Sequence, residues 1–247
     1  MRNKIKTITV SIISHNQGIL TDHVLKQLVK FKQVKKIILT INDIVDDNHK
    51  YFSHKKIYLI KNKFIKGFSQ NHNDAFKLVK TEFFSICNPD INFINNPFVI
   101  LCRDLNNKNL LAAPKIINRY GTIEDSARNF PSIINLILRR FFLQYGRYKN
   151  NNNNIYYPDW IAGMFWLIRR RDFLKMRGFS EDFFLYFEDV DFCRRIWEQG
   201  FTISINPKIS VMHDARRSSN KKIRYLILHL KSFFIYFKKY FLKKKPR

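Results

Sequence analysis

The sequence is short of acidic residues. Asp and Glu account for 19 of its 247 residues, against 45 Lys and Arg, which gives a formal charge of +26 at neutral pH. Such an excess of positive charge indicates an anionic partner, which could be nucleic acid, an acidic membrane face or a phosphorylated ligand. Charge alone does not distinguish between these three.

Cysteine and glycine-rich motifs are also scarce. The three cysteines, Cys87, Cys102 and Cys193, show no paired spacing, which argues against a disulfide framework or a zinc knuckle and predicts reduced thiols in a cytosolic setting. Neither G-x-G-x-x-G nor a Walker loop is present, so dinucleotide and ATP binding lose their main support. We also expect no signal peptide and no membrane-spanning helix, because the first residues lead directly into a strand-like run and no apolar stretch is long enough.

What the sequence does contain is typical of a folded α/β protein. Hydrophobic residues make up 45% of the chain, including 24 Phe, enough for a real core in one large domain or two joined halves. Strand signals alternate with helix signals, which predicts a parallel sheet flanked by helices. We expect strands at residues 7–14, 36–41, 57–60, 83–87 and 209–212, and helices at residues 21–31 and 73–79.

Polar residues follow several of these predicted strands. Ligands of parallel sheets bind beyond the carboxyl ends of the strands, so these positions are candidates for binding a nucleotide or a sugar. They are Ser14, His15, Asn16, Asn42, Asp43 and the Asn88-Pro89-Asp90 triplet. The composition of this triplet equally fits a simple turn after a strand.

Three carboxylates, Glu188, Asp189 and Asp191, lie within four residues between a run of aromatics and Arg194-Arg195. If a helix begins near Glu188, the acids occupy its first turn, where the helix dipole favours them. This favourable placement at a helix start is enough to explain why the three carboxylates lie there. The other is a general base, because an apolar environment at a helix start can tune the basicity of a carboxylate.

An ordered set of short motifs runs from about Thr7 to about Ser219, and together they resemble the family 2 glycosyltransferases, most closely the rhamnosyltransferase-like branch. Each motif alone is weak, but their order along nearly the whole chain is specific. The motifs are Asn62, Gly67-Phe68, Asn71 and Asn73; Asn88-Pro89-Asp90; Ala113-Pro114-Lys115 with Gly121-Thr122; Trp160-Ile161-Ala162-Gly163; residues 183–195; and His213 with Arg216-Arg217-Ser218-Ser219.

The resemblance implies a GT-A fold, a Rossmann-like mixed and mainly parallel sheet flanked by helices. Residues 1–220 would form this domain, with a nucleotide-binding half up to about residue 90 and an acceptor half over about 91–220. It also implies an enzyme that transfers a sugar from a nucleotide diphosphate sugar to a saccharide acceptor with inversion. We expect dTDP-rhamnose as the donor, with UDP-type donors as the other possibility, and a role in making bacterial surface polysaccharide or lipopolysaccharide.

The same resemblance assigns roles to individual residues. Asp189 would be the catalytic base, with Glu188 and Asp191 positioning the acceptor. Asp90 and His213 would hold Mn²⁺ or Mg²⁺, for which carboxylate and imidazole are suitable ligands, although His213 could equally close a strand as a polar residue. Acceptor contacts are also expected from Trp160 and Gly163, for which core packing is an equal alternative. Nucleotide-sugar contacts are expected from Ser14, Asn16, Asn42, Asp43, Asn73 and Asn88.

The last segment, residues 221–247, predicts a basic amphipathic helix. Apolar residues recur at helical spacing from Ile223 to Phe241, and the chain has no acidic residue after Arg216. Such a helix suits an anionic membrane surface, so we expect a cytoplasmic protein held peripherally on the inner membrane face, with a lipid-linked acceptor. Packing on the domain is the alternative for the helix. The stripe at residues 133–145 is a second apolar and basic candidate, and Asn150–Asn154 indicates a polar loop.

Two other functions fit parts of the sequence. A nucleic-acid-binding protein would explain the charge, but no helix-turn-helix, RRM or zinc pattern is present, and no nucleic-acid partner is expected. A catalytically inactive GT-A scaffold at the membrane surface would share the tail, and would differ from the enzyme in failing to turn over a donor.

Overall fold

The protein is described here from a computed structural model, which covers residues 6–43, 53–131, 153–213, 223–241 and 246. Some predictions lie wholly or partly outside these residues: the stripe at 133–145, most of the Asn150–Asn154 run, residues 216–219 and part of the segment 221–247.

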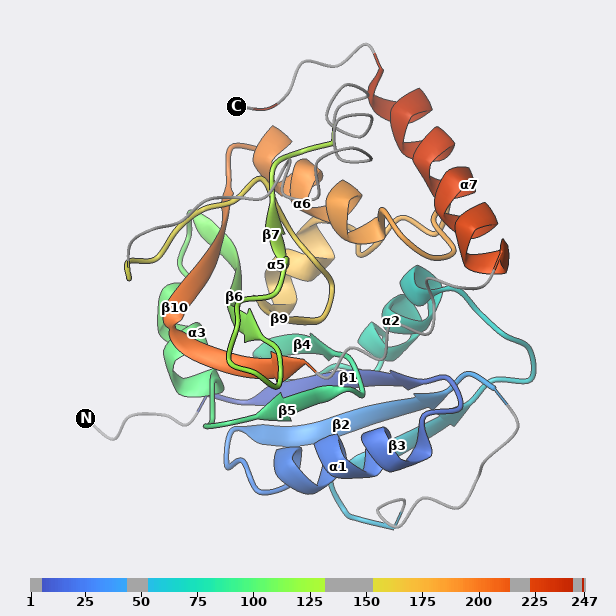
Figure 1. Ribbon diagram of the computed structural model, residues 1–247. Helices are drawn as coiled ribbons and strands as arrows, with labels where there is room; N and C mark the ends of the chain where they lie inside the picture. Colours follow the sequence, from blue (N-terminus) through green and yellow to red (C-terminus); the bar gives the residue numbers. More distant parts are fainter. Residues whose placement is uncertain (1–5, 44–52, 132–152, 214–222, 242–245, 247) are drawn as a thin grey trace.

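The described residues form one eight-stranded sheet and a small two-stranded one (Figure 1). The large sheet has the order β3-β2-β1-β4-β9-β6-β10-β5. β9 and β5 run antiparallel to their neighbours and the other pairs are parallel, which confirms a mixed, mainly parallel sheet. The strands are β1 (Ile8–Ser14), β2 (Val34–Ile41), β3 (Ile57–Lys61), β4 (Phe83–Cys87), β5 (Ile91–Phe93), β6 (Asn109–Ile117), β7 (Ala127–Arg128), β8 (Trp160–Ile161), β9 (Phe165–Arg169) and β10 (Thr202–His213).

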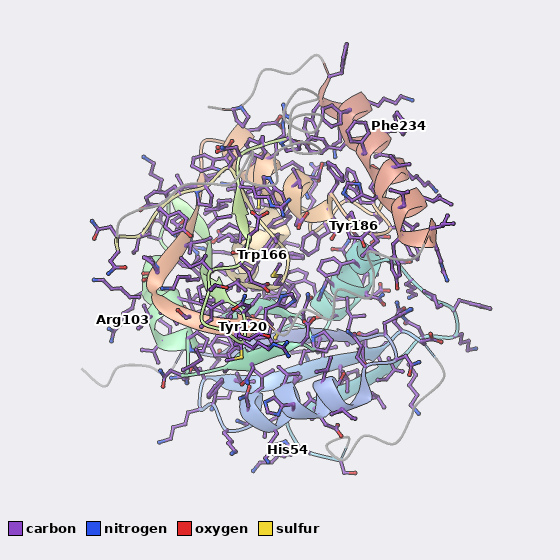
Figure 2. All side chains as sticks on the ribbon, in the orientation of Figure 1. His54, Arg103, Tyr120, Trp166, Tyr186 and Phe234 are labelled. Carbon is purple, nitrogen blue, oxygen red and sulfur yellow. The ribbon has the colours of Figure 1, made fainter. Side chains whose placement is uncertain are left out.

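Helices cover both faces of the large sheet, with a separate core under each. One core lies beneath α1 (Gly18–Leu28) and α3 (Phe98–Asp104). The other lies beneath α2 (Phe68–Phe76), α5 (Arg170–Lys175) and α6 (Glu188–Glu198), where Trp166 packs on Phe192. Trp166 is near the centre of the molecule in Figure 2. In β4 and β9 alternate residues serve the two cores, because successive side chains of a strand point to opposite faces.

Two elements differ from the predicted pattern for local reasons. Helix α2 begins at Phe68, five residues before the predicted start, and its first turn is polar, with Asn71 donating a side-chain hydrogen bond to the carbonyl of Gly67 at 3.0 Å. Strand β10 begins at Thr202 rather than Ile209. Its pairing with β6 shifts register between Asn206 and Ser210, around Pro207, so the alternation that marks a strand is interrupted there.

Helix α7 (Ile223–Tyr240) follows every strand in sequence and packs its inner face on α6 and the loop before it. Its Lys239 and Tyr240 both contact one oxygen of Asp191, each at 2.7 Å, and Arg195 binds the other oxygen at 2.8 Å. Asp191 is fully buried. The predicted alternative of packing on the domain is therefore present for one face of the helix.

The outer face of α7 is exposed and apolar. Ile223 is 77% exposed and Phe234 is 66% exposed; Figure 2 labels Phe234 on α7 and Tyr186 between this helix and the centre of the molecule. None of the described helices is both long enough and apolar enough to span a bilayer.

Candidate active site

A cavity of about 400 Å³ lies beyond the carboxyl ends of β1, β2 and β4. Its walls come from α2, the loop before α6, the first turn of α6 and the first two turns of α7, which meet at the same end of the sheet (Figure 1). Six of the residues to which the family resemblance gave a role line this cavity, namely Asn42, Asn88, Asp90, Gly163, Glu188 and Asp189, and the candidate His15 lines it as well.

Asp189 is held at the start of α6 by backbone donors. The N–H of Gly163 donates to its Oδ2 at 3.1 Å and the N–H of Val190 donates to its Oδ1 at 2.8 Å. The chain reaches this point through Tyr186 and Phe187, both in the left-handed region with φ of 70° and 66°, a conformation that costs energy for such residues. Burial raises the pKa of Asp189, while the two N–H groups and the charge of Arg128 oppose the rise.

Glu188 lies beside Asp189 in a different environment. It is only 5% exposed, and its Oε2 has no hydrogen-bond partner among the described residues. Burial, and next the charge of Asp189, raise the pKa of Glu188 well above its usual range. Two adjacent buried carboxyl groups do not readily ionise together, and the two N–H donors favour the negative charge on Asp189 rather than on Glu188.

Asp90 and His213 are brought together by strand pairing. β5 pairs antiparallel with β10 so that Ile91 lies opposite His213, which places the preceding Asp90 beside the imidazole, with Nε2 to Oδ2 at 3.2 Å. Glu124 accepts from or donates to Nδ1 on the other side at 2.7 Å. Burial lowers the pKa of His213, but hydrogen bonds and charges from Asp90 and Glu124 outweigh it and raise the pKa to about 9.

The donor set around Asp90 fits a divalent cation. Its Oδ1 is buried and has no partner among the described residues, and Asp90 lines the cavity. A carboxylate oxygen without a partner costs free energy unless a cation or donor binds it. Within the described residues no three His, Cys, Asp or Glu side chains form a preformed metal cluster, so oxygen ligands from a substrate or solvent would complete the shell.

The predicted nucleotide-binding residues fall into two groups. Asn42 and Asn88 line the cavity, although the amide of Asn42 already bonds the backbone of Lys66 and the side chain of Asn62. The others do not line it. Ser14 accepts a hydrogen bond from Thr21, and Asn16 is exposed. Asp43 lies near His15, with Oδ2 to Nε2 at 3.9 Å. Asn73 forms hydrogen bonds with the backbone of Phe179 and with the side chain of Glu181.

Two predicted acceptor-binding residues also lie elsewhere. Asp191 points away from the cavity, and its carboxylate is occupied by Arg195, Lys239 and Tyr240. Trp160 donates its indole N–H to the carbonyl of Asn129 at 3.0 Å, and Arg128 lies over its ring. These placements give no support to acceptor binding by either side chain.

The cavity contains residues that sequence reasoning missed. His72 is buried, lies within hydrogen-bonding distance of Ser11 at 2.9 Å, and has a pKa lowered to about 3 by burial. Lys66 binds Asp74 at 2.7 Å, and Arg224 enters from α7. The Gly121-Thr122 motif was a usable signal for Glu124, because the turn there folds Glu124 back onto Ile116. Nothing in the sequence pattern indicated Arg224.

The large sheet and the helices on its two faces have the GT-A fold of solved glycosyltransferases. The chain resembles in fold a structure of GalNAc-T7 with UDP, GalNAc and Mn²⁺ (TM-score 0.65, 15% identity, covering 86% of this chain and 44% of that one). It likewise resembles the mannosyltransferase PcManGT from Pyrobaculum calidifontis in complex with GDP-Man and Mn²⁺ (TM-score 0.65, 12% identity, covering 96% and 65%).

Sequence similarity narrows the class. The chain is 31% identical over 194 residues to the rhamnosyltransferase WbbL of Escherichia coli (strain K12), covering 70% of each. It is 29% identical over 133 residues to the N-acetylglucosaminyl-diphospho-decaprenol L-rhamnosyltransferase of Mycobacterium tuberculosis (strain ATCC 25618 / H37Rv), covering 50% of this chain and 43% of that protein. No family model matches. The chain belongs to the rhamnosyltransferase-like family 2 glycosyltransferases, as the motifs predicted.

Proposed function

We propose that the chain transfers rhamnose from dTDP-rhamnose, with inversion, to a lipid-linked saccharide in the synthesis of bacterial surface polysaccharide or lipopolysaccharide. The names of both relatives include rhamnosyltransferase, and one includes a diphospho-decaprenol acceptor. The observation that carries the proposal is that one cavity contains both the Asp189 carboxyl group, which two backbone N–H groups bind, and a buried oxygen of Asp90 that has no partner among the described residues. The half up to about residue 90 would bind the nucleotide, and residues 91–220 the acceptor.

Asp189 supplies the base. Its carboxylate takes the proton of the acceptor hydroxyl while that oxygen forms a bond to the anomeric carbon, and the bond from this carbon to the diphosphate oxygen breaks with its electron pair leaving on the diphosphate. The N–H groups of Gly163 and Val190 fix the carboxylate in place, and its raised pKa increases its basicity. A positioned base of this kind contributes about 10²–10⁴ in rate.

Asp90 and His213 are the residues that would hold Mn²⁺ or Mg²⁺. When bound, such a cation stabilises the negative charge that develops on the departing diphosphate. Glu124 holds the second nitrogen of His213, the usual way in which a neighbouring carboxylate orients a metal-binding imidazole. Asn88, which lines the same cavity, is a neutral contact for ribose or sugar hydroxyls.

Helix α7 supports a peripheral position on the inner face of the cytoplasmic membrane. The apolar stripe of α7, defined as Ile223, Leu226, Ile227, Leu230, Phe234 and Phe241, is exposed along its outer side. Arg224, Lys231 and Lys238 flank it on one side at helical spacing, and each cation near an anionic bilayer adds about 1 kcal/mol of attraction. Insertion of the stripe would remove its apolar area from water without unpacking the inner face.

A thermal-shift and turnover series tests the proposal. The melting temperature of the wild type is measured with dTDP, UDP, GDP or dTDP-rhamnose, each in the presence and absence of Mn²⁺. A ligand that binds the folded protein raises this temperature by mass action. We expect a Mn²⁺-dependent shift with dTDP and release of dTDP from dTDP-rhamnose when a lipid-diphosphate saccharide is added. A Mn²⁺-dependent response to UDP or GDP alone would overturn the donor assignment.

A further inference from the structure

Helix α7 has a second surface besides its apolar stripe. Arg224, Tyr225 and Leu228 line the cavity that contains Glu188 and Asp189. The helix that we assign to the membrane therefore also forms a wall of the site where the acceptor must be placed.

The positive charges that line the cavity are unequally available. Of its lining residues, Lys66 and Arg224 carry a permanent positive charge. Lys66 is bound to Asp74 at 2.7 Å, whereas Arg224 has no hydrogen bond or ion pair with any residue that the structure describes. His72 is neutral because burial lowers its pKa to about 3. Arg224 is thus the cation left to meet an anionic part of a substrate.

The position of Arg224 indicates which anionic group of a substrate it would bind. Its neighbours Ile223, Leu226 and Ile227 belong to the exposed apolar stripe, while its own side chain lines the cavity. A lipid-linked saccharide must keep its tail in the membrane while its sugar reaches Asp189, so the charged group that joins tail and sugar lies between the two. Arg224 lies between the exposed apolar stripe and the cavity, and a guanidinium can bind two phosphate oxygens at once through parallel N–H groups.

We propose that Arg224 is an acceptor-binding residue that holds the diphosphate of a lipid-linked acceptor, with Tyr225 and Leu228 against its first sugar. This inference rests on the proposed function and adds a contact to the acceptor-binding residues predicted from the sequence, which are Glu188, Asp191, Trp160 and Gly163. Two contacts fix the helix for this role. Ser232 donates to the carbonyl of Leu185 at 2.7 Å, and Asp191 binds the last turn.

Equilibrium binding to the full chain separates this role from general attraction to anions. The probes are geranyl diphosphate, geraniol, and dTDP with Mn²⁺, titrated into the wild type, Arg224→Gln and Lys231→Gln. Lys231 is the matched control because it is an exposed cation on the same helix that does not line the cavity. Arg224→Lys is included as the conservative variant, and melting temperatures verify that each variant folds.

We expect Arg224→Gln to weaken binding of geranyl diphosphate roughly tenfold, the effect of losing hydrogen bonds to a charged group, and Arg224→Lys to weaken it less. Lys231→Gln should change it by less than about twofold, as an exposed charge does. Binding of dTDP should not change. The proposal is overturned by equal losses in Arg224→Gln and Lys231→Gln, by a loss confined to dTDP, or by a wild type that binds geraniol as tightly as geranyl diphosphate. Failure of the proposed function would appear separately, as a wild type that binds geranyl diphosphate but neither binds dTDP nor turns over dTDP-rhamnose.

Discussion

Replacing Asp191 by Asn removes one charge from the contact between α6 and α7. The Asp191 carboxylate is fully buried and is bound by Arg195 at 2.8 Å and by Lys239 and Tyr240 at 2.7 Å each. The Asn amide can still accept at one atom, but its NH₂ group would face a donor. Breaking a buried ion pair by neutralising one partner costs about 3–5 kcal/mol. For a chain of this size each kcal/mol lowers the melting temperature by about 2–4 °C, so we expect a loss of roughly 6–20 °C.

The matched control is Asp74→Asn. Asp74 also binds two cations, Lys66 and Lys77, at 2.7 Å each, but its side chain is 25% exposed, so the expected cost is about 1 kcal/mol or less. Calorimetry or denaturant unfolding of both variants beside the wild type measures the difference. A melting temperature of Asp191→Asn within about 2 °C of the wild type would correspond to a cost of only about 1 kcal/mol or less. If this is found, and the variant loses only acceptor affinity, then our account of Asp191 as the residue that holds α7 in place is refuted.

Three further predictions concern the cavity. Asp189→Asn should lower turnover by a factor of about 10²–10⁴ with little change in dTDP binding, and retained turnover in this variant would remove Asp189 from the role of base. Because burial raises the pKa of Asp189, the activity of the wild type should decline on the acid side at a higher pH than it would with an ordinary aspartate. Asp90→Ala should abolish the Mn²⁺-dependent part of the thermal shift with dTDP, and a shift that keeps its metal dependence would move the cation site elsewhere. Glu188→Gln should raise stability above neutral pH. The folded pKa of Glu188 lies above its unfolded value, so the folded state binds more protons and wild-type stability falls as pH rises through that interval; unfolding free energies of the two proteins that run parallel from pH 5 to pH 9 would contradict this.

Much of the fold could be predicted from the sequence because hydrophobic patterning decides it. β4 was predicted at its observed bounds, Phe83–Cys87, since a short apolar run between polar turns has few alternatives. The start of α2 was missed because Asn71 and its neighbours have weak helix propensity, and there a side-chain hydrogen bond to Gly67 compensates. The early part of β10 was missed because Pro207 interrupts the alternation.

The site was predictable where residues adjacent in sequence share a function. Glu188 and Asp189 face one cavity because a helix begins at Glu188, as the charge placement indicated. Asp191, which the sequence grouped with these two, does not line the cavity: three residues after the start of α6 it lies on the buried face of that helix, toward α7. Arg224 lines the cavity only because α7, which follows β10 in the chain, packs beside it. The hydrophobic periodicity of a segment predicts a helix but not the part of the protein on which that helix packs.

The place of α7 in the chain also has a consequence for synthesis. Every described strand and α6 precede it, so while the ribosome is still translating residues 223–240 the sheet can already fold. Until Lys239 and Tyr240 emerge, the carboxylate of Asp191 lacks two of its three partners and the cavity lacks the wall that carries Arg224. A chain whose translation stops before residue 239 would thus have every described strand but an open apolar surface over α6, which is the kind of surface that chaperones and proteases recognise.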